Sequence, residues 1–326
     1  MSAVTKDQYS SWRRVLSPTG NTGDAVYRVL MLLIALLMVG IVIAMVWALA
    51  TESMPSIRQF GFSFLKGRTW DPIRGDFGAL PFIYGTVASS VIALLISVPF
   101  SLGIAIFLVE QAPYYLARPI GFLVELLAAI PSVVYGLWAI FVLAPFLREY
   151  VQPPLARVLG WTPLFRGQIT GFGLLTGGII LAIMVMPYIM SVGREVLLAV
   201  PNTQREAALA LGATRWEAVT TAVLPYARSG IVGAVILGLG RALGETMAVT
   251  MLIGNRHEIA ASLFAPGYTM AAAIANEFSE AVGDLHLSAL AYVAFLLFLV
   301  TVIVNAGARL LIWRVARGSG AGSSAL

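Results

Sequence analysis

Several residue types that carry much of protein chemistry are scarce in this chain of 326 residues, which has no cysteine, two lysines and two histidines. Without cysteine, no disulfide, thiolate metal site or cysteine nucleophile can form. Neither Lys6 nor Lys66 lies in a G-x-x-x-x-G-K-[ST] loop, so the chain does not hydrolyse ATP by the Walker mechanism. His257 and His286 stand apart in the sequence, and we expect ordinary surface histidines rather than metal ligands. The sequence therefore predicts no catalytic residue, no metal site and no cofactor bound by this chain.

Charged residues are also few. They make up 11% of the chain, against about 25% in soluble domains. Hydrophobic residues make up 59%, and the mean hydropathy is +0.87. The sequence therefore predicts an integral membrane protein. The net charge of +5 indicates membrane topology or an anionic substrate rather than nucleic-acid binding.

Six segments are long and apolar enough to cross a bilayer, which takes roughly 20 residues each. They are residues 29–51, 77–109, 119–146, 169–192, 229–253 and 285–308. We expect polar loops at 52–76 and 147–166. Residues 259–276 are uncharged, but Pro266-Gly267 interrupts them, so we expect an interfacial or re-entrant segment rather than a seventh span. The predicted fold is all-α, with a tail at 1–28, a membrane domain at 29–308 and a tail at 309–326.

Six spans place both termini on one side of the membrane. If that side is the cytoplasm, twelve of the 21 Lys and Arg residues lie in inner segments and eight in outer loops. The positive-inside rule then favours cytoplasmic termini. This orientation also places residues 203–225, between the fourth and fifth spans, in the cytoplasm.

Residues 203–225 carry two helix-start signals in quick succession. Thr203 with Glu206 and Thr214 with Glu217 each fit the T-x-x-E capping box. Gly212 lies between them, where a helix end favours a residue that tolerates positive φ. We expect two short helices joined by a tight turn, the second stopped by Pro225.

Each helix of this pair, residues 203–225, has an apolar face. The residues are Ala207, Ala208 and Leu211 on the first helix and Trp216, Val219 and Val223 on the second. One interpretation is a loop that lies on its own membrane domain. The other, which we favour, is a compact helical projection that docks into a groove of another protein.

The strongest signal inside a span is Arg241 with Glu245. An arginine at the centre of a span costs about 2.5–3.5 kcal/mol on insertion scales, so it usually faces a protein interior or a water-filled path. Residues four apart on a helix can pair. The pair could simply neutralise itself and hold helices together. We favour a cationic site on the route of an anion, because ion pairs used only for packing can often be replaced by apolar residues.

Other features of the spans concern packing. Gly240 with Gly244 and Gly173 with Gly177 form G-x-x-x-G steps, which favour close helix approach within the chain or against a partner subunit. Prolines inside spans kink helices; they are Pro99, Pro131 and Pro187. Glu125 lies near the end of its span, and we expect it to reach water.

The helix pair resembles the E-A-A loop of ABC-type importer permeases. The resemblance rests on Glu206-Ala207-Ala208, Gly212 and Leu224-Pro225; Ala222 stands where the motif normally has isoleucine. Longer pieces resemble the phosphate-specific branch of this family, the PstC type. They are FGALPFIYGT (77–86), IPSVVYG (130–136), REAALALGAT (205–214) and GRALGETMAVTMLIGN (240–255).

The resemblance implies a type I ABC importer permease fold and transport of inorganic phosphate across the cytoplasmic membrane of a bacterium. It implies three partners: a second permease of the PstA type, a dimer of ATPase subunits that binds ATP and Mg, and an external phosphate-binding protein. It also implies that Arg241 and Glu245 line the substrate path. The residues expected to couple to the ATPase are Thr203, Glu206, Ala207, Ala208, Gly212, Trp216, Glu217, Leu224 and Pro225.

Other functions stay open at this point. The same class includes permeases for molybdate or sulfate. A secondary anion transporter would need no ATPase, and a docking helix pair argues against it. A membrane enzyme such as a phosphatase would need a nucleophile or metal ligands, and the spans carry only the Arg–Glu pair.

Overall fold

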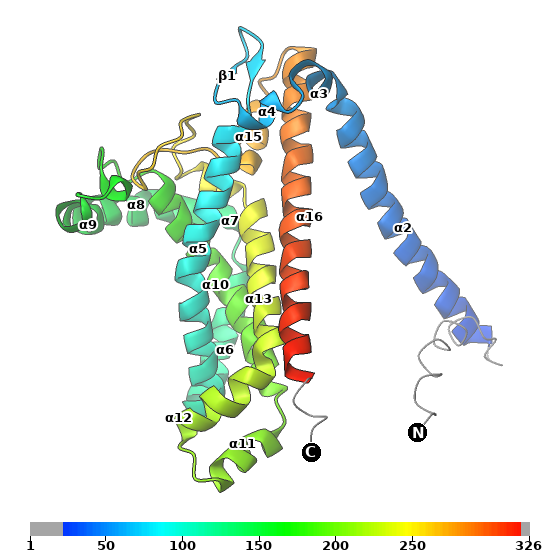
Figure 1. Cartoon of the computed structure of the whole chain (residues 1–326), viewed down its shortest axis with the longest axis vertical. Helices are drawn as coiled ribbons and strands as arrows, with labels where there is room; N and C mark the ends of the chain where they lie inside the picture. Colours follow the sequence, from blue (N-terminus) through cyan, green and yellow to red (C-terminus); the bar gives the residue numbers. More distant parts are fainter. Residues whose placement is uncertain (1–21, 321–326) are drawn as a thin grey trace. The chain divides into compact units, whose positions relative to one another are not determined.

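The computed structural model describes residues 22–320, and Figure 1 shows a mainly helical chain with a few longer loops. Residues 1–21 and 321–326, parts of the two predicted tails, lie outside the described residues. For Thr22, Ala25, Ala308 and residues 311–320 only the backbone is described. The chain divides into two compact units, Met1–Thr51 and Glu52–Leu326, and each is described by itself.

The described residues contain six helices that are long and apolar enough to cross a bilayer, as the sequence predicts. Their bounds are Val26–Glu52, Leu80–Gln111, Ser132–Leu159, Leu174–Leu198, Arg215–Gly244 and Asp284–Gly307. The first belongs to α2 (Thr22–Glu52), which makes up the described part of the first unit. Its described side chains are almost all exposed within this unit.

In the second unit, α10 (Leu174–Leu198) lies at the centre of a helix bundle. It packs against α5 (Leu80–Ile106) and α13 (Leu224–Gly244), and 67% of its apolar stretch is buried, against 28% for α5. α5 continues through a π-helical turn, Phe107–Gln111. α16 (Asp284–Gly320) packs against α13 and continues as helix beyond residue 309, where the sequence predicts a tail.

The third predicted span, 119–146, is wrong in its bounds. α6 (Tyr114–Ala129) ends before Pro131, because the residue before a proline is held out of the helical region; Ile130 has ψ 130°. Helix then runs from Ser132 to Leu159 through α7 (Ser132–Trp138), α8 (Ala144–Phe146) and α9 (Gln152–Leu159), with π turns Ala139–Leu143 and Leu147–Val151 between them. The predicted loop at 147–166 is thus largely helical, since prolines are tolerated in the first turn of α9.

The fifth predicted span, 229–253, is also wrong in its bounds. The helix begins as α12 (Arg215–Ala218), passes through a π turn, Val219–Val223, and continues as α13 until Gly244. Pro225 therefore does not stop a helix. The π turn, in which the Leu224 N–H donates to the carbonyl oxygen of Val219, changes the hydrogen-bond pattern just before the residue that lacks an N–H. After Gly244 the chain breaks and resumes as the short α14 (Met247–Thr250).

Short elements form one end of the second unit, opposite the helix pair (Figure 1). They are α3 (Met54–Phe60), α4 (Ser63–Lys66), β1 (Trp70–Asp71), β2 (Asp76–Phe77) and α15 (Met270–Glu277). The antiparallel strands pair Trp70 with Phe77, and both rings are buried beside Phe64 and Phe82. We call this the hairpin end. As expected, residues 259–276 form a loop and the eight-residue α15 rather than a seventh span.

The predicted G-x-x-x-G steps differ in use. Gly173 and Gly177 pack against residues 253–265 of the same chain. A Cβ at Gly240 or Gly244 would have no described atom within 4 Å. Gly173 and Gly177 therefore allow close packing within the chain, whereas Gly240 and Gly244 leave an open face on α13.

Gly85 on α5 offers a test of this packing. A Cβ there would overlap the backbone carbonyl of Tyr268, whereas one at Gly103 of the same helix would meet nothing within 4 Å. We expect Gly85→Ala to destabilise the protein by about 1–3 kcal/mol, the usual cost of overpacking. Gly103→Ala should be neutral or stabilising by about 0.5–1 kcal/mol, because alanine suits a helix better. Melting temperatures in detergent would measure both, and equal values for the two variants would contradict the packing.

Candidate functional site

Arg241 lies where α13 ends, not at the centre of a span. It occupies the last turn of the helix, and Glu245 follows as the C-terminal cap with extended backbone, ψ 127°. The two side chains therefore do not share a helical face, and the described residues contain no ion pair between them. The predicted pairing of Arg241 with Glu245 is wrong, because the helix breaks between them.

The Glu245 carboxylate serves the next helix instead. Its Oε1 accepts a hydrogen bond from the backbone N–H of Ala248 in α14, at 3.4 Å. The residue is 9% exposed. A carboxylate at the start of a helix satisfies an otherwise unpaired N–H, so Glu245 stabilises the restart of the helix.

Arg241 is oriented by an aromatic ring. Its guanidinium carbon lies 4.4 Å from the centre of the Tyr188 ring, a cation–π distance. Its Nε is buried and has no hydrogen-bond partner among the described residues. An unpaired buried donor is costly, and the site is therefore suited to an acceptor from outside the chain.

Tyr188 connects this break to a second one. Its hydroxyl donates to the carbonyl oxygen of Ala128, at 2.8 Å, and the Tyr135 hydroxyl donates to that of Leu127, at 2.8 Å. Both carbonyls belong to the last turn of α6, where helix carbonyls lack their usual partners; that of Leu127 also accepts from the backbone N–H of Ile130 at 3.3 Å. α7 and α14, which follow the two breaks, pack together through Gly136 and Ala248. Two interrupted helices thus meet at Arg241. Irregular backbone inside a membrane is tolerated where protein buries it or where it lines a water-filled cavity.

The helix pair forms the opposite end of the second unit (Figure 1). α11 (Asn202–Ala210) and α12 are joined by Gly212 at φ +89°, as predicted. The capping box of Thr214 and Glu217 is also confirmed, with both reciprocal hydrogen bonds present. The predicted box at Thr203 and Glu206 is wrong. Pro201 caps α11, so Thr203 already lies inside the helix and no side chain caps it.

The predicted apolar faces of the helix pair divide between two uses. Val219 and Val223 are buried in the membrane bundle. Leu211 is 91% exposed and Trp216 57% exposed, with the exposed Ala207 near them in the chain. Part of the helix pair therefore packs on the membrane domain of the same chain. The tip of the pair, which carries Leu211 and Trp216, is an exposed apolar surface.

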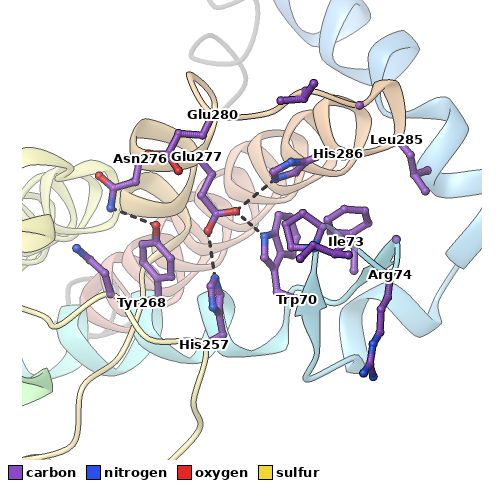
Figure 2. Close-up of a pocket in the computed structure, with 16 residues that line it drawn as sticks. Trp70, Ile73, Arg74, His257, Tyr268, Asn276, Glu277, Glu280, Leu285 and His286 are labelled. Carbon is purple, nitrogen blue, oxygen red and sulfur yellow. Dashed lines mark hydrogen bonds and ion pairs between the residues drawn. The ribbon is translucent and has the colours of Figure 1, made fainter.

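Sequence reasoning missed a cluster at the hairpin end, drawn in Figure 2. The Glu277 carboxylate accepts hydrogen bonds from Trp70 Nε1, from His257 Nε2 at 3.1 Å and from His286 Nε2 at 3.4 Å. These donors come from β1, from the loop after α14 and from the first turn of α16. The expectation of isolated surface histidines is wrong, since the fold brings both onto one carboxylate. The one feature of the sequence that could have indicated this cluster is that both histidines lie in or beside the same loop.

This Glu277 cluster lines a cavity of about 690 Å³. Burial acts to raise the pKa of the Glu277 carboxyl, but hydrogen bonds from His257 and Trp70 outweigh it, and the pKa is lowered. Burial also raises the pKa of the nearby Tyr268 to about 12, so that hydroxyl stays protonated. The described residues contain no group of three or more His, Cys, Asp or Glu side chains arranged to hold a metal ion. The cluster is therefore a hydrogen-bonded tie between four segments.

Comparison with known proteins defines the class of this chain. Residues 101–317, more than half of the chain, match the family described as the binding-protein-dependent transport system inner membrane component. This is the family of ABC importer permeases, whose members are the transport subunits that cross the membrane. The matched stretch includes both helix breaks and the helix pair.

Individual relatives show to which branch of this family the chain belongs. The phosphate transport system permease protein PstC of Mesorhizobium japonicum is 48% identical over 306 residues, which cover 91% of this chain and 92% of the relative. PstC of Haemophilus influenzae is also 48% identical, over 88% of this chain and 92% of the relative. PstC 2 of Mycobacterium tuberculosis is 45% identical, over 80% and 83%. The chain therefore belongs to the PstC-type branch of the binding-protein-dependent transport permeases.

Solved structures agree on the fold. A chain of the inward-facing MetNI methionine ABC transporter matches with a TM-score of 0.54 and 18% identity, over 72% of this chain and 95% of that one. Another crystal form of that transporter matches with a TM-score of 0.50 and 19% identity, over 73% and 94%. These matches bear on the fold alone, and they confirm the expected type I importer architecture.

The Glu277 cluster makes stability depend on pH. Because the pKa of Glu277 is lower in the folded protein than its unfolded value of about 4.3, its ionised form stabilises the fold above that pH. We expect Glu277→Gln to destabilise the protein by about 1.5–3 kcal/mol at pH 7, the usual worth of hydrogen bonds to a charged group. The difference from wild type should shrink as the pH falls through and below 4.3. Melting temperatures between about pH 2.5 and pH 8 would measure this, because the loss occurs below the unfolded pKa.

Glu280→Gln is the matched control, because Glu280 lines the same cavity but is exposed and makes no ion pair among the described residues. We expect no change in that variant. A difference between Glu277→Gln and wild type that does not vary with pH would contradict the role of the carboxylate charge.

Proposed function

We propose that this chain forms half of a translocation path for inorganic phosphate in an ATP-driven importer of the bacterial cytoplasmic membrane. The observation that carries the proposal is the position of Arg241, whose Nε is buried without a partner among the described residues, at a helix break in a chain whose close relatives are phosphate permeases. The planar guanidinium presents donors in a fork that matches phosphate oxygens. Tyr188, rather than Glu245, holds that fork in place.

Glu245 gives the path its chemical selectivity. One carboxylate oxygen accepts from Ala248, and the other has no hydrogen-bond partner among the described residues. That second oxygen accepts a hydrogen bond from protonated phosphate. Sulfate carries no proton at neutral pH and cannot donate one, so the carboxylate repels it. Permeases for sulfate or molybdate would have no use for such a group.

The exposed tip of the helix pair docks into a separate ATPase subunit, which binds ATP and Mg. Support comes from the exposed Leu211 and Trp216 and from the missing Walker loop, which requires another chain to supply the energy. Both termini are cytoplasmic in this arrangement. A helix-in-groove contact fits a short amphipathic element of this kind.

The remaining partners occupy other surfaces. The open face of α13 at Gly240 and Gly244 receives a second, PstA-type permease, since small residues allow close approach of helices in membranes. The external phosphate-binding protein delivers its anion at the hairpin end. The chain contacts the bilayer and no nucleic acid.

Charge substitutions test the path. In membrane vesicles that contain the complete importer, we expect Arg241→Gln to lower phosphate uptake roughly ten- to hundredfold, the worth of a hydrogen bond to a charged group. Glu245→Gln should lower phosphate uptake as well and weaken discrimination against sulfate. Tyr188→Phe keeps the ring and serves as the control for Tyr188→Leu, which removes it and should lower uptake. Wild-type uptake by Glu245→Gln beside a failed Arg241→Gln would exclude the proposed role of the carboxylate.

Purification from detergent tests the assembly. We expect the chain to copurify with a second permease and an ATPase, each identified by mass. Gly240→Leu with Gly244→Leu should release the second permease, because the added side chains separate the helices. Gly103→Leu is the control, as its position is also open but lies on α5. A chain that purifies alone and still transports phosphate would refute the assembly.

A further inference from the structure

α11 is attached to the membrane bundle in an unusual way. None of its nine residues is buried, and it packs mainly against α12 and the π turn Val219–Val223 rather than against α5 or α10. Its partner α12 is different, because it runs through a π turn directly into α13. The two halves of the helix pair therefore reach the spans by different routes.

The attachment of α11 is the side chain of Arg205. Its Nε lies 3.1 and 3.2 Å from the two carboxylate oxygens of Glu110, and its Nη2 lies 2.7 Å from Oε1. Nη2 also donates to the carbonyl oxygen of Leu197 at 2.9 Å, and Nη1 donates to that of Val200 at 2.7 Å. A further contact of Nη1 with Asn202 Oδ1, at 3.3 Å, stays within α11. One guanidinium thus binds three other segments.

Two of these acceptors belong to spans. Glu110 lies in the π turn that ends α5, and Leu197 lies in the last turn of α10. A cation at the end of α10 also interacts favourably with the helix dipole. The side chains of Arg205 and Glu110 are 19% and 11% exposed, so water and salt screen them little. Bidentate geometry of this kind fixes direction as well as distance.

We propose that the Arg205–Glu110 pair passes the movement of α11 to α5 and α10, so that these helices move together with α13. The inference rests on the proposed function, in which an ATPase moves the helix pair. α12 acts directly on α13 through continuous helix. Without the Arg205–Glu110 pair, α11 would slip against the bundle and α13 would move without its neighbours. Both residues are positioning residues, since neither lies at the helix breaks that hold Arg241.

Transport per ATP hydrolysed tests this in the reconstituted importer with its ATPase and binding protein. Glu110→Gln keeps the shape of the side chain but removes its charge. It also replaces one of the two acceptor oxygens with an NH2 group, and a guanidinium cannot accept a hydrogen bond from that group. We expect assembly and ATP hydrolysis to remain, and phosphate transported per ATP to fall about fivefold or more, the lower end of coupling between sites. Glu110→Asp, which keeps the charge on a shorter stem, should fall between wild type and Glu110→Gln.

Glu195→Gln is the matched control. It removes an ion pair at the same end of α10, Arg194 with Glu195 at 3.3 Å, but Glu195 is 69% exposed and the pair lies within one helix. We expect wild-type transport per ATP in this variant. If Glu110→Gln lowers assembly, hydrolysis and transport in equal proportion, the pair is merely structural and the proposal fails.

A distance measurement tests whether α11 moves together with α5, and it does not depend on the identity of the substrate. The chain has no cysteine, so spin labels can be placed at Gln204→Cys on α11 and Leu95→Cys on α5 without background from this chain. Double electron–electron resonance should give one narrow distance in wild type, unchanged when nucleotide is trapped. In Glu110→Gln, or in Glu110→Asp if that variant alone assembles, trapped nucleotide should shift or broaden it. An unchanged distance in the variant overturns the proposal. A wild-type importer that moves no phosphate would refute the proposed function, while the spin-label result would still stand.

Discussion

The structure depends on one constraint, that backbone groups inside a bilayer must find partners within the protein. Where α6 and α13 break, that requirement is met by specific side chains. The hydroxyls of Tyr135 and Tyr188 pair with carbonyls of α6, and the Glu245 carboxylate pairs with an N–H of α14. Each break has a local cost, and side chains from neighbouring helices offset it. Arg241 therefore lies at the end of a helix, beside the break, rather than on the side of a continuous helix.

At both ends of the second unit, one charged side chain forms hydrogen bonds with segments that are distant in the sequence. At the hairpin end, one carboxylate, Glu277, collects donors from three segments. At the other end, one guanidinium, Arg205, collects acceptors from the ends of α5 and α10. Each is largely shielded from water, so its hydrogen bonds are worth more than those of surface charges. Between these ties the helices pack through apolar residues, and this hydrophobic packing is non-directional.

Much of the fold could be predicted from the sequence because bilayer crossing imposes long apolar segments. The number of spans, the turn at Gly212 and the capping box at Thr214 all follow from local rules, and the structure confirms them. The errors occur where neighbours override such rules. Pro225 is carried through by a π turn, and Thr203 lies inside α11 because Pro201 begins it. The break after Gly244 was hidden, because an unbroken apolar stretch with Arg241 at its centre reads as one helix.

The sequence by itself determined that this chain is a six-span membrane protein, that it has no Walker phosphate loop, and that Arg241, Glu245 and the helix pair are its unusual features. Those conclusions follow from composition, from a missing phosphate loop and from residue spacing. Only the tertiary structure decided which groups meet: Arg241 with Tyr188, Arg205 with Glu110, and two histidines with Glu277. These partners are between 9 and 95 positions apart in the chain. Spacing along a helix predicts contacts only within one or two turns, so pairs at such separations are set by how the helices pack.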